Sequence, residues 1–337
     1  MAGGDLTADE CTWAMGRIMA GEATGAQIAG FAVALRAKGE TAVEVSGLAD
    51  GMLAHARRFT VPARAVDIVG TGGDNSNSVN ISTMAAVVTA AAGATVVKHG
   101  GRGSSSMTGA ADVLERLGVV IGLSPAAVER CVREVGIGFC FAAAFHPSMR
   151  HAAGPRRELG VPTFFNILGP LTNPAQPAAA AIGCGSLPLA PLMADVLAVR
   201  GIEALVFRGD DGLDELTTTT TSTVWRVRGG VVDVTSVDPA RLGIAPATAD
   251  DLRGGEAAFN ADVVRRLVAG ETGPVRDAVV LNAAAALAAH RGLTDDLEAD
   301  LAAGLVAARE ALTSGRAATL LDRWIAVSQQ AAAALPA

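Results

Sequence analysis

The sequence predicts an α/β fold, in which a large domain with a central, mainly parallel sheet is joined to a small all-helical domain. Apolar residues recur at helical spacing through the first sixty residues. From about residue 65 onward, short apolar strands alternate with helices, a pattern typical of parallel sheets. The last hundred residues read as alanine-rich helices with polar breaks. A chain of 337 residues is long enough for two such domains.

Capping boxes predict where the N-terminal helices begin. In such a box a threonine hydroxyl accepts from the amide three residues on, and a Glu or Gln at that position reaches back to the threonine amide. The chain has three of them, formed by Thr7 with Glu10, Thr24 with Gln27, and Thr41 with Glu44. The capping boxes thus predict three helix starts. The apolar faces of these helices have either a purely structural role or a role in contacting another subunit.

The α/β part follows a strand–helix order that can be read residue by residue. A short apolar strand is expected over 66–69, with glycines directly after it. Ser124 before Pro125 marks another helix start. Further elements are expected as a helix over 82–92, a strand over 95–97, a strand ending at His146, a helix and proline-rich connection over 155–177, a strand in EALVFRG, and a hairpin around Gly229 and Gly230.

Composition excludes several classes of protein. The net charge of −7 and a pI near 5.3 argue against a general nucleic-acid binder, which would carry a basic stripe. The N-terminus MAGGDLTADE has no apolar segment, and the longest apolar run, 84–97, is too short to cross a bilayer. We expect a cytoplasmic protein with no membrane or nucleic-acid partner. Its cysteines lack a CxxC pair and are expected as buried free thiols: Cys11, Cys131, Cys140 and Cys184.

A glycine-rich loop leads from the first expected strand into a helix. It reads GTGGDNSNSVNIST over residues 70–83. Backbone amides in such a loop, together with the N-terminus of the following helix, favour a phosphate group. Asn80, Ser82 and Thr83 add side-chain donors in the first turn. The loop has no GK[ST] and does not fit G-x-G-x-x-G, so it predicts phosphate binding without a P-loop.

A second loop, VVKHGGRGSSSMTG over 96–109, follows the next strand. Lys98, His99 and Arg102 place three potentially cationic groups within five residues, and the loop contains no acidic partner for them. Hydroxyl donors follow at Ser104, Ser105 and Ser106. We therefore expect this loop to bind an anion opposite the first turn of the 82–92 helix.

Acidic residues follow the strand EALVFRG. Their carboxylates are the oxygen ligands that Mg²⁺ prefers when it is bound together with substrate phosphates. An acidic turn at the end of a strand can also be merely solvated, but two phosphate-type loops elsewhere in the chain favour the metal. The acids are Asp210, Asp211, Asp214 and Glu215. Motifs of covalent catalysis, such as G-x-S-x-G, do not occur, which favours catalysis by positioning and charge stabilisation.

Five motifs, in order along the whole chain, resemble those of the anthranilate phosphoribosyltransferase family. They are GTGGD…NIST, KHG-R…SS, FHPSMRH, RRELG…FNILGPLTNP and DGLDE. The resemblance implies transfer of the phosphoribosyl group of phosphoribosyl pyrophosphate (PRPP) to anthranilate in tryptophan biosynthesis, with two Mg²⁺ ions. It implies a homodimer formed through a discontinuous helical domain, residues 1–62 with about 155–180. Residues 63–154 with about 181–337 would then form the α/β domain.

The same resemblance implies three sets of site residues. PRPP would be bound by Gly70, Gly73, Asp74, Ser78, Asn80, Ile81, Ser82, Thr83, Lys98, Gly101, Arg102, Gly103, Ser104, Ser105 and Ser106. Anthranilate would lie against Gly70, His99, Gly101, His146 and Arg156, the guanidinium being suited to its carboxylate. Ser82 would contact one Mg²⁺, and Asp214 with Glu215 the other. No general base is assigned, and His99 is the one candidate.

Two positions depart from the family pattern. The family's KHGN motif has asparagine where this chain has Gly101, which removes an amide and adds space. Pro155 directly precedes Arg156, where the family usually has an apolar residue, so the start of the arginine helix is expected to change. The acceptor therefore stays open between anthranilate and a related aromatic amine. Anthranilate is favoured because one lost hydrogen bond is worth about 1 kcal/mol.

Two more distant functions also stay open. A pyrimidine nucleoside phosphorylase shares the two-lobed architecture, although DGLDE and KHG favour PRPP with Mg²⁺. A non-enzymatic, nucleic-acid-binding relative of the same fold would need a basic groove. The net charge of −7 and the pair Asp214–Glu215 argue against that reading.

Overall fold

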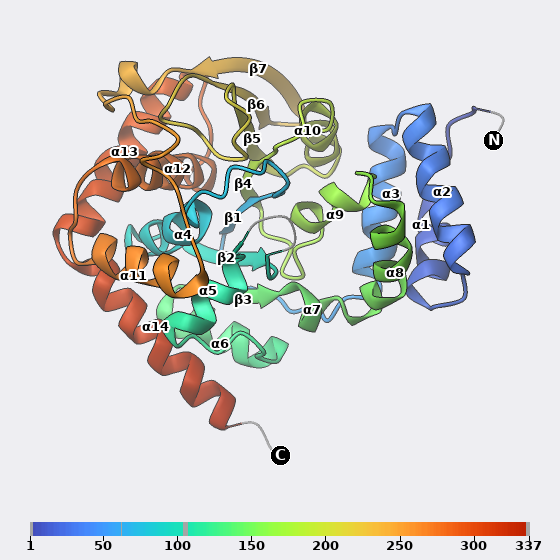
Figure 1. Ribbon diagram of the computed structural model, residues 1–337, viewed down its shortest axis with the longest axis horizontal. Helices are drawn as coiled ribbons and strands as arrows, with labels where there is room; N and C mark the ends of the chain where they lie inside the picture. Colours follow the sequence, from blue (N-terminus) through green and yellow to red (C-terminus); the bar gives the residue numbers. More distant parts are fainter. Residues whose placement is uncertain (1–2, 62, 104–106, 335–337) are drawn as a thin grey trace.

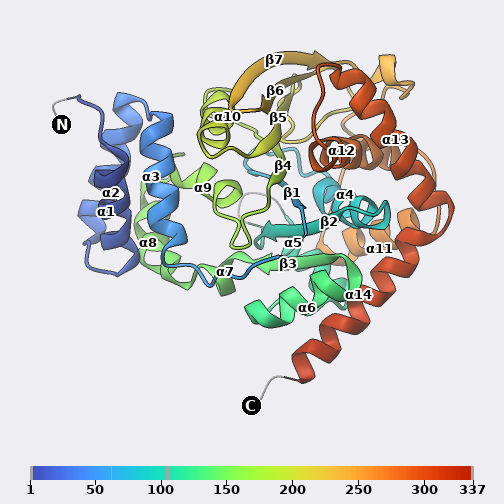
Figure 2. The ribbon, with the colours of Figure 1, turned by 180° about the vertical axis from the view of Figure 1, so that it is seen from behind.

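The computed structural model describes residues 3–61, 63–103 and 107–334 and has two lobes. Figures 1 and 2 show a small lobe of helices that carries the N-terminus, beside a larger lobe in which helices surround a sheet. The predicted fold class is confirmed.

Three N-terminal helices build most of the small lobe: α1 (Ala8–Met19), α2 (Gly25–Lys38) and α3 (Ala42–Leu53). All three predicted capping boxes are formed. Two helices from the middle of the chain join them. Helix α8 (Arg150–Leu159) packs against α1 and α2, and α9 (Phe165–Leu171) packs against α3.

The large lobe is organised by one seven-stranded sheet in the order β3-β2-β1-β4-β5-β6-β7. The first five strands in this order are parallel, and the last two form the predicted antiparallel hairpin around Gly229 and Gly230. Strand bounds are β1 (Ala65–Gly70), β2 (Thr95–Gly100), β3 (Ile137–Phe141), β4 (Ala179–Gly183), β5 (Glu203–Gly209), β6 (Ser222–Arg228) and β7 (Val231–Val237).

Helices cover both faces of the sheet and separate two apolar cores. On β4, Ala179 and Ala181 face one core while Ala180 and Ile182 face the other, as the two-residue period of a strand requires. The second core runs without a break into the helical lobe. The remaining helices are α4 (Ile81–Ala91), α5 (Ala110–Leu117), α6 (Pro125–Val135), α7 (Ala142–Phe145), α10 (Ala190–Val199), α11 (Ala257–Val268), α12 (Pro274–Arg291), α13 (Leu297–Thr313) and α14 (Arg316–Ala333).

Three predicted boundaries were wrong. Strand β2 continues to Gly100 because it stays paired with β3 up to Gly100–Phe141, so Lys98 and His99 lie on a strand and not in a loop. Strand β3 ends at Phe141, since the alanines after it form the single turn of α7. Helix α8 begins at Arg150, and Pro155 lies inside it without setting its start.

All four cysteines are free and buried, as predicted. Among the helices of the described ranges, none combines the length and the apolar character needed to cross a membrane.

Candidate active site

A cavity of about 650 Å³ lies at the carboxyl ends of the parallel strands, where α/β proteins commonly bind ligands. Segments after β1, β2, β3 and β5 line it on one side, and α8, α9 and Met52 of α3 line it on the other. It therefore lies between the two lobes. Of the site residues that the family resemblance implies within the described ranges, every one except Gly73 lines this cavity. Ser104, Ser105 and Ser106 lie outside the described residues.

The acidic side of the cavity depends on two glycines. A Cβ atom at Gly70 would lie 2.2 Å from Asp214 Oδ2, and one at Gly183 would lie 1.7 Å from the Asp214 carbonyl oxygen. The segment after β5 can therefore approach β1 and β4 only where side chains are absent. This close approach brings Asp214 and Glu215 to the start of α4.

Burial governs the charge of these two carboxyl groups. The Gly72 amide donates to Asp214 Oδ2 at 2.6 Å, and the Ser82 amide donates to Glu215 Oε1 at 3.0 Å. Burial nevertheless raises the pKa of Asp214 well above its usual range, and it raises the pKa of Glu215 to about 7 despite the nearby Lys98 ammonium. Glu215 Oε2 is buried and has no hydrogen-bond partner within the described part of the chain.

These oxygens fit a hard divalent cation. The unpartnered oxygen of Glu215 and the carboxyl of Asp214 gain most from a positive charge, because burial disfavours their ionised forms. The described residues contain no group of three or more His, Cys, Asp or Glu side chains arranged to hold a metal. An ion here would therefore need further oxygen ligands from a substrate or water.

The other two predicted acids have a structural role. Asp211 accepts from the hydroxyls of Thr217 and Thr219 and from the Leu213 amide, and Asp210 accepts from Thr221 and Thr223. Neither lines the cavity. The prediction that four acids contribute to the metal site is thus narrowed to two, because threonines already satisfy the first pair.

Lys98 lies at the floor of the cavity and is almost fully buried. Its ammonium donates to the Ile68 carbonyl oxygen at 2.6 Å and to Ser82 Oγ at 3.3 Å. Burial lowers the pKa of Lys98, while Asp67, Glu215 and Asp214 act in the opposite direction. The ammonium therefore joins strand β1 to the predicted metal ligand Ser82.

Arg102 does have acidic partners, contrary to the prediction from the loop sequence. Its guanidinium pairs with Asp112 at 2.8 Å and with Glu115 at 2.9 Å, both from helix α5. These contacts raise the pKa of Arg102. The loop itself contains no acid, but α5 folds back beside it and supplies both partners.

His99 and His146 form a stacked pair whose ring centroids are 5.1 Å apart. His99 Nδ1 lies 2.9 Å from the Gly169 carbonyl oxygen, and His146 Nε2 lies 2.9 Å from the Thr172 carbonyl oxygen. A carbonyl can only accept, so these nitrogens carry the protons and the other nitrogen of each ring is a lone-pair acceptor. Burial lowers the pKa of His99 to about 3 and that of His146 to about 4. The expected cationic role of His99 is therefore wrong.

Arg156 supplies a cation that the protein itself does not neutralise. Its guanidinium lies over the Phe165 ring, 5.2 Å from the centroid. It makes no ion pair with an acid of the described residues. Burial lowers its pKa. A carboxylate ligand would offset the burial of this charge, in a bidentate geometry that guanidinium favours.

The glycine-rich loop has the backbone shape of an anion-binding turn. Gly72, Gly73, Asn75 and Asn77 all have positive φ, which orients successive amides differently from a strand. Asn80 is held by Asn260 and by the Thr108 carbonyl oxygen. Thr83 Oγ1 is buried without a hydrogen-bond partner in the described ranges.

Gly101 borders open space. A Cβ atom built on it meets nothing within 4 Å, and its φ is outside the left-handed region. Other residues line the cavity without having been predicted, among them Arg150 and Phe165, over whose ring the Arg156 guanidinium lies. Arg150 lies in the motif FHPSMRH, so that motif was the available signal.

Comparison with known proteins agrees with this geometry. A family model described as glycosyl transferase family, a/b domain, matches residues 62–318, and its helical bundle domain matches residues 1–56. The anthranilate phosphoribosyltransferase of Nocardioides sp. is 65% identical over 328 residues, covering 97% of this chain and 96% of the relative. The Saccharopolyspora erythraea enzyme is 62% identical, covering 96% and 92%. The chain belongs to the anthranilate phosphoribosyltransferase family.

Solved structures of the family are similar over almost the whole chain. The Thermus thermophilus enzyme superposes with a TM-score of 0.91 at 42% identity, covering 97% of each chain. The Saccharomyces cerevisiae enzyme in complex with PRPP and Mg has a TM-score of 0.87 at 26% identity, covering 96% of this chain and 94% of the other. The same yeast enzyme has also been solved with 4-fluoroanthranilate.

Proposed function

We infer that this protein transfers the phosphoribosyl group of PRPP to the amine of anthranilate, giving N-(5-phosphoribosyl)anthranilate and pyrophosphate in tryptophan biosynthesis. One observation carries this inference. A single cavity holds the carboxyl pair Asp214 and Glu215, whose ionised forms burial disfavours, and, on its other wall, the half-buried Arg156, which makes no ion pair with an acid of the described residues. The first suits the metal-bound pyrophosphate of PRPP, and the second suits the carboxylate of anthranilate.

The PRPP side would be formed by the glycine-rich loop, the start of α4 and the end of β2. Asp74, Ser78, Asn80, Ser82 and Thr83 line this part of the cavity. The positive φ angles give the loop the shape of an anion-binding turn, and Thr83 offers a hydroxyl without a hydrogen-bond partner among the described residues. The predicted roles of Gly73, Arg102, Gly103 and the serines at 104–106 are retained in this proposal.

Magnesium would be held by Asp214 and Glu215, with Ser82 toward a second ion. Bound Mg²⁺ stabilises the charge that develops on the leaving pyrophosphate. Glu215 holds the Ser82 amide, and Lys98 holds the Ser82 hydroxyl, so the three predicted metal ligands are positioned together. We propose two ions because these ligands lie on two segments, 82 and 214–215.

On the acceptor side, the residues would bind and orient without taking a proton from a resting amine. Arg156 would bind the carboxylate. His99 Nε2 and His146 Nδ1, which have no hydrogen-bond partner in the described ranges, would accept from the bound acceptor. An aryl amine has its own lone pair available for attack on C1 of the ribose, so orientation between the lobes carries much of the rate. With a pKa of about 3, His99 is a weak base, which disfavours it as a general base.

The experiment is a steady-state assay of the purified protein with PRPP, Mg²⁺ and a panel of aminobenzoates. We expect saturation by anthranilate, loss of product on chelation of Mg²⁺, and a higher KM for anthranilate in Arg156→Ala with a smaller effect on PRPP. If another aromatic amine gave product and anthranilate did not, the acceptor assignment would be wrong. If no amine gave product although PRPP bound, the transferase function would be wrong.

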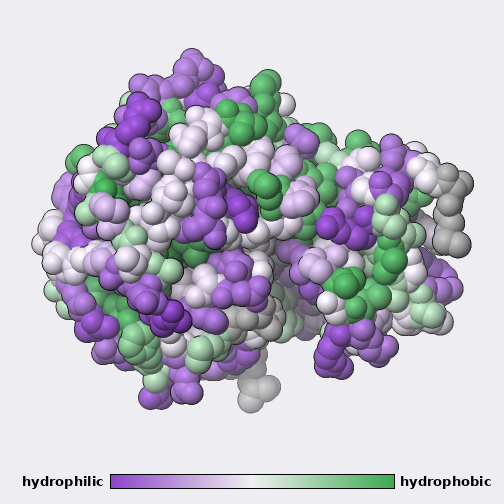
Figure 3. Space-filling model, turned by 45° about the horizontal axis from the view of Figure 1, so that its top comes forward, coloured by the Kyte–Doolittle hydropathy of each residue, from purple (hydrophilic) through white to green (hydrophobic). Residues whose placement is uncertain are grey.

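We also propose that the protein is a cytoplasmic homodimer formed through the small lobe, with α8 and α9 as part of that lobe. Large apolar side chains are exposed on its helices, with Trp13 68%, Val33 43% and Val43 50% accessible. Figure 3 shows hydrophobic groups gathered on this lobe. Sedimentation analysis of wild type and Trp13→Glu tests the dimer, which the charged variant is expected to weaken.

A further inference from the structure

The two strands that carry the site, β1 and β2, are paired only at their first residues. Ala65 pairs with Thr95 and Val66 with Val96, and no further pairs form between these strands in the described chain. Both strands nevertheless continue, because β1 stays paired with β4 up to Gly70–Gly183 and β2 with β3 up to Gly100–Phe141. The centre of the sheet is therefore split beneath the cavity.

Polar side chains replace the missing ladder bonds. The His99 amide donates to Asp67 Oδ1 at 3.1 Å, and the Val97 carbonyl oxygen accepts from Asn173 Nδ2 at 2.8 Å. The Lys98 ammonium donates to the Ile68 carbonyl oxygen at 2.6 Å. Buried backbone groups need such partners, so the split can exist only with these side chains in place.

Asp67 is the centre of this arrangement. It is 2% exposed in a strand that is otherwise apolar, and its Oδ2 accepts from Asn173 Nδ2 at 2.8 Å. Asn173 follows the C-terminal end of α9. At this end the carbonyl oxygen of Gly169, in the last turn, binds His99, and that of Thr172, the C-cap, binds His146. One carboxylate thus contacts both the β2 backbone and the segment that orients the histidines.

A continuous ladder would place the end of β2 differently. Parallel strands in full register lie about 4.8 Å apart along their whole length. The split lets the Lys98 side chain turn back between the strands and reach Ser82. It also leaves His99 and Gly101 bordering the cavity.

Resting on the proposed function, we propose that Asp67 is a positioning residue for the transfer reaction. Its carboxylate lies between β1 and β2. There it fixes the position of Lys98 on the PRPP side of the cavity and that of His99 on the acceptor side. It contacts neither substrate itself, since it does not line the cavity.

The test compares Asp67→Asn with the exchange variant Asp67→Asn/Asn173→Asp. In the single variant two amide groups face each other. The exchange restores one donor and one acceptor between positions 67 and 173 but removes the amide that donates to the Val97 carbonyl oxygen, so only a partial recovery is expected. We expect Asp67→Asn to lower kcat/KM for anthranilate at least tenfold, and the exchange to recover at least threefold of that loss. Ser328→Ala is the matched control: Ser328 is buried and hydrogen-bonded to Val120, far from the cavity, so only Tm should fall.

Several results would overturn the proposal. One is an Asp67→Asn protein with a lowered Tm but with kcat/KM within twofold of wild type. Another is a loss of kcat/KM in Ser328→Ala as large as the loss in Asp67→Asn. Should Asp67→Asn fail to fold, Asn173→Ser carries the test, with a threefold or greater loss expected and unchanged kinetics contradicting it. Wild-type protein without activity would refute the proposed function instead, and Mg²⁺-dependent PRPP binding by calorimetry would then compare the same variants.

Discussion

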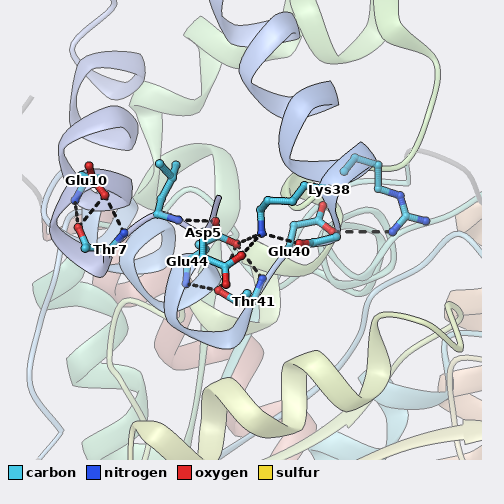
Figure 4. Close-up of polar contacts among 10 residues, drawn as sticks. Asp5, Thr7, Glu10, Lys38, Glu40, Thr41 and Glu44 are labelled. Atoms are coloured by element: carbon cyan, nitrogen blue, oxygen red, sulfur yellow. Dashed lines mark hydrogen bonds and ion pairs between the residues drawn. The ribbon is translucent and has the colours of Figure 1, made fainter. Parts of the chain in front are cut away.

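Two buried carboxylates, one in each lobe, are treated by the protein in opposite ways. Glu44 of α3 accepts from the Leu6 amide at 2.9 Å, the Thr41 amide at 2.8 Å and the Lys38 ammonium at 3.0 Å (Figure 4). Burial acts to raise its pKa, but these contacts outweigh burial, and the pKa of Glu44 is lowered. Glu215 has one amide donor and a free oxygen, and burial raises its pKa to about 7.

This difference separates a structural carboxylate from a functional one. The cost of burying Glu44 is offset by groups of the same chain, so the cluster stabilises the small lobe. The free-energy cost of burying ionised Glu215 is only partly offset by the protein, and a bound cation would offset the rest. The environment, and not the residue type, tells the two apart.

The largest expected effect is on catalysis, in Glu215→Gln. Removing one carboxylate from the metal site should lower product formation by about 10³-fold, about 4 kcal/mol in the barrier, because the leaving pyrophosphate loses its charge stabilisation. The free energy of unfolding should stay the same or rise. Asp210→Asn, from the same acidic segment but bound to threonines, is the control and should keep wild-type kcat. If both variants lost the same fraction of activity, the comparison between metal-binding and structural acids would be wrong.

Next is a loss of stability in Glu44→Gln. The neutral side chain leaves Lys38 with Asp5 as its one acidic partner among the described residues, and it offers one acceptor oxygen where the carboxylate offered two to the Leu6 and Thr41 amides. We expect the free energy of unfolding in urea to fall by about 3 kcal/mol at pH 7. Because the pKa of Glu44 is lowered, this contribution is present above pH about 4.5 and is lost as pH falls through the folded-state value. Glu10→Gln changes the same type of capping box at an exposed site, and its cost should be much smaller than that of Glu44→Gln. A smaller effect in Glu44→Gln than in Glu10→Gln would contradict the comparison.

The third prediction concerns how stability depends on pH. Neutral, buried His146 makes the protein less stable as pH falls, whereas acids with raised pKa values make it less stable as pH rises. Burial lowers the pKa of His146 to about 4, so the unfolded chain binds a proton first as pH falls below 6.5. The stability from neutral His146 is present above pH 6.5 and is lost toward pH 4, at up to about 1.4 kcal/mol per pH unit. His146→Gln should therefore lose less stability than wild type between pH 7 and pH 4. The measurement is the free energy of unfolding of both proteins as a function of pH. If the two lose stability equally between pH 7 and pH 4, the pKa of His146 is not lowered in the folded state.

The smallest effect is expected at the acceptor end, in Gly101→Asn. Open space at this position allows the side chain to enter without strain. One added hydrogen bond to the acceptor should lower KM for anthranilate about fivefold, about 1 kcal/mol. Gly122→Asn, which also points into open space but does not line the cavity, should leave KM unchanged. A raised KM for anthranilate with a lowered KM for another aminobenzoate would indicate a different natural acceptor.

Local patterns in the chain were sufficient for much of the fold. Capping boxes need only residues three apart, and all three formed. Strand–glycine–helix order placed the loops at one edge of a parallel sheet, and the five motifs placed nearly every site residue on one cavity. These features depend on hydrogen bonds and side-chain periods within a few residues, which the sequence states directly.

Contacts between distant segments decided the rest. The end of β2 depended on its pairing with β3, and the state of Arg102 depended on acids of α5. Neither Asp67 nor its link to Asn173, 106 positions away, has a local pattern. Only the folded chain determines which polar groups are buried and which of them are satisfied, because burial and partners both come from packing. That is why the acidic motif offered four candidate metal ligands, of which only Asp214 and Glu215 line the cavity in the folded protein.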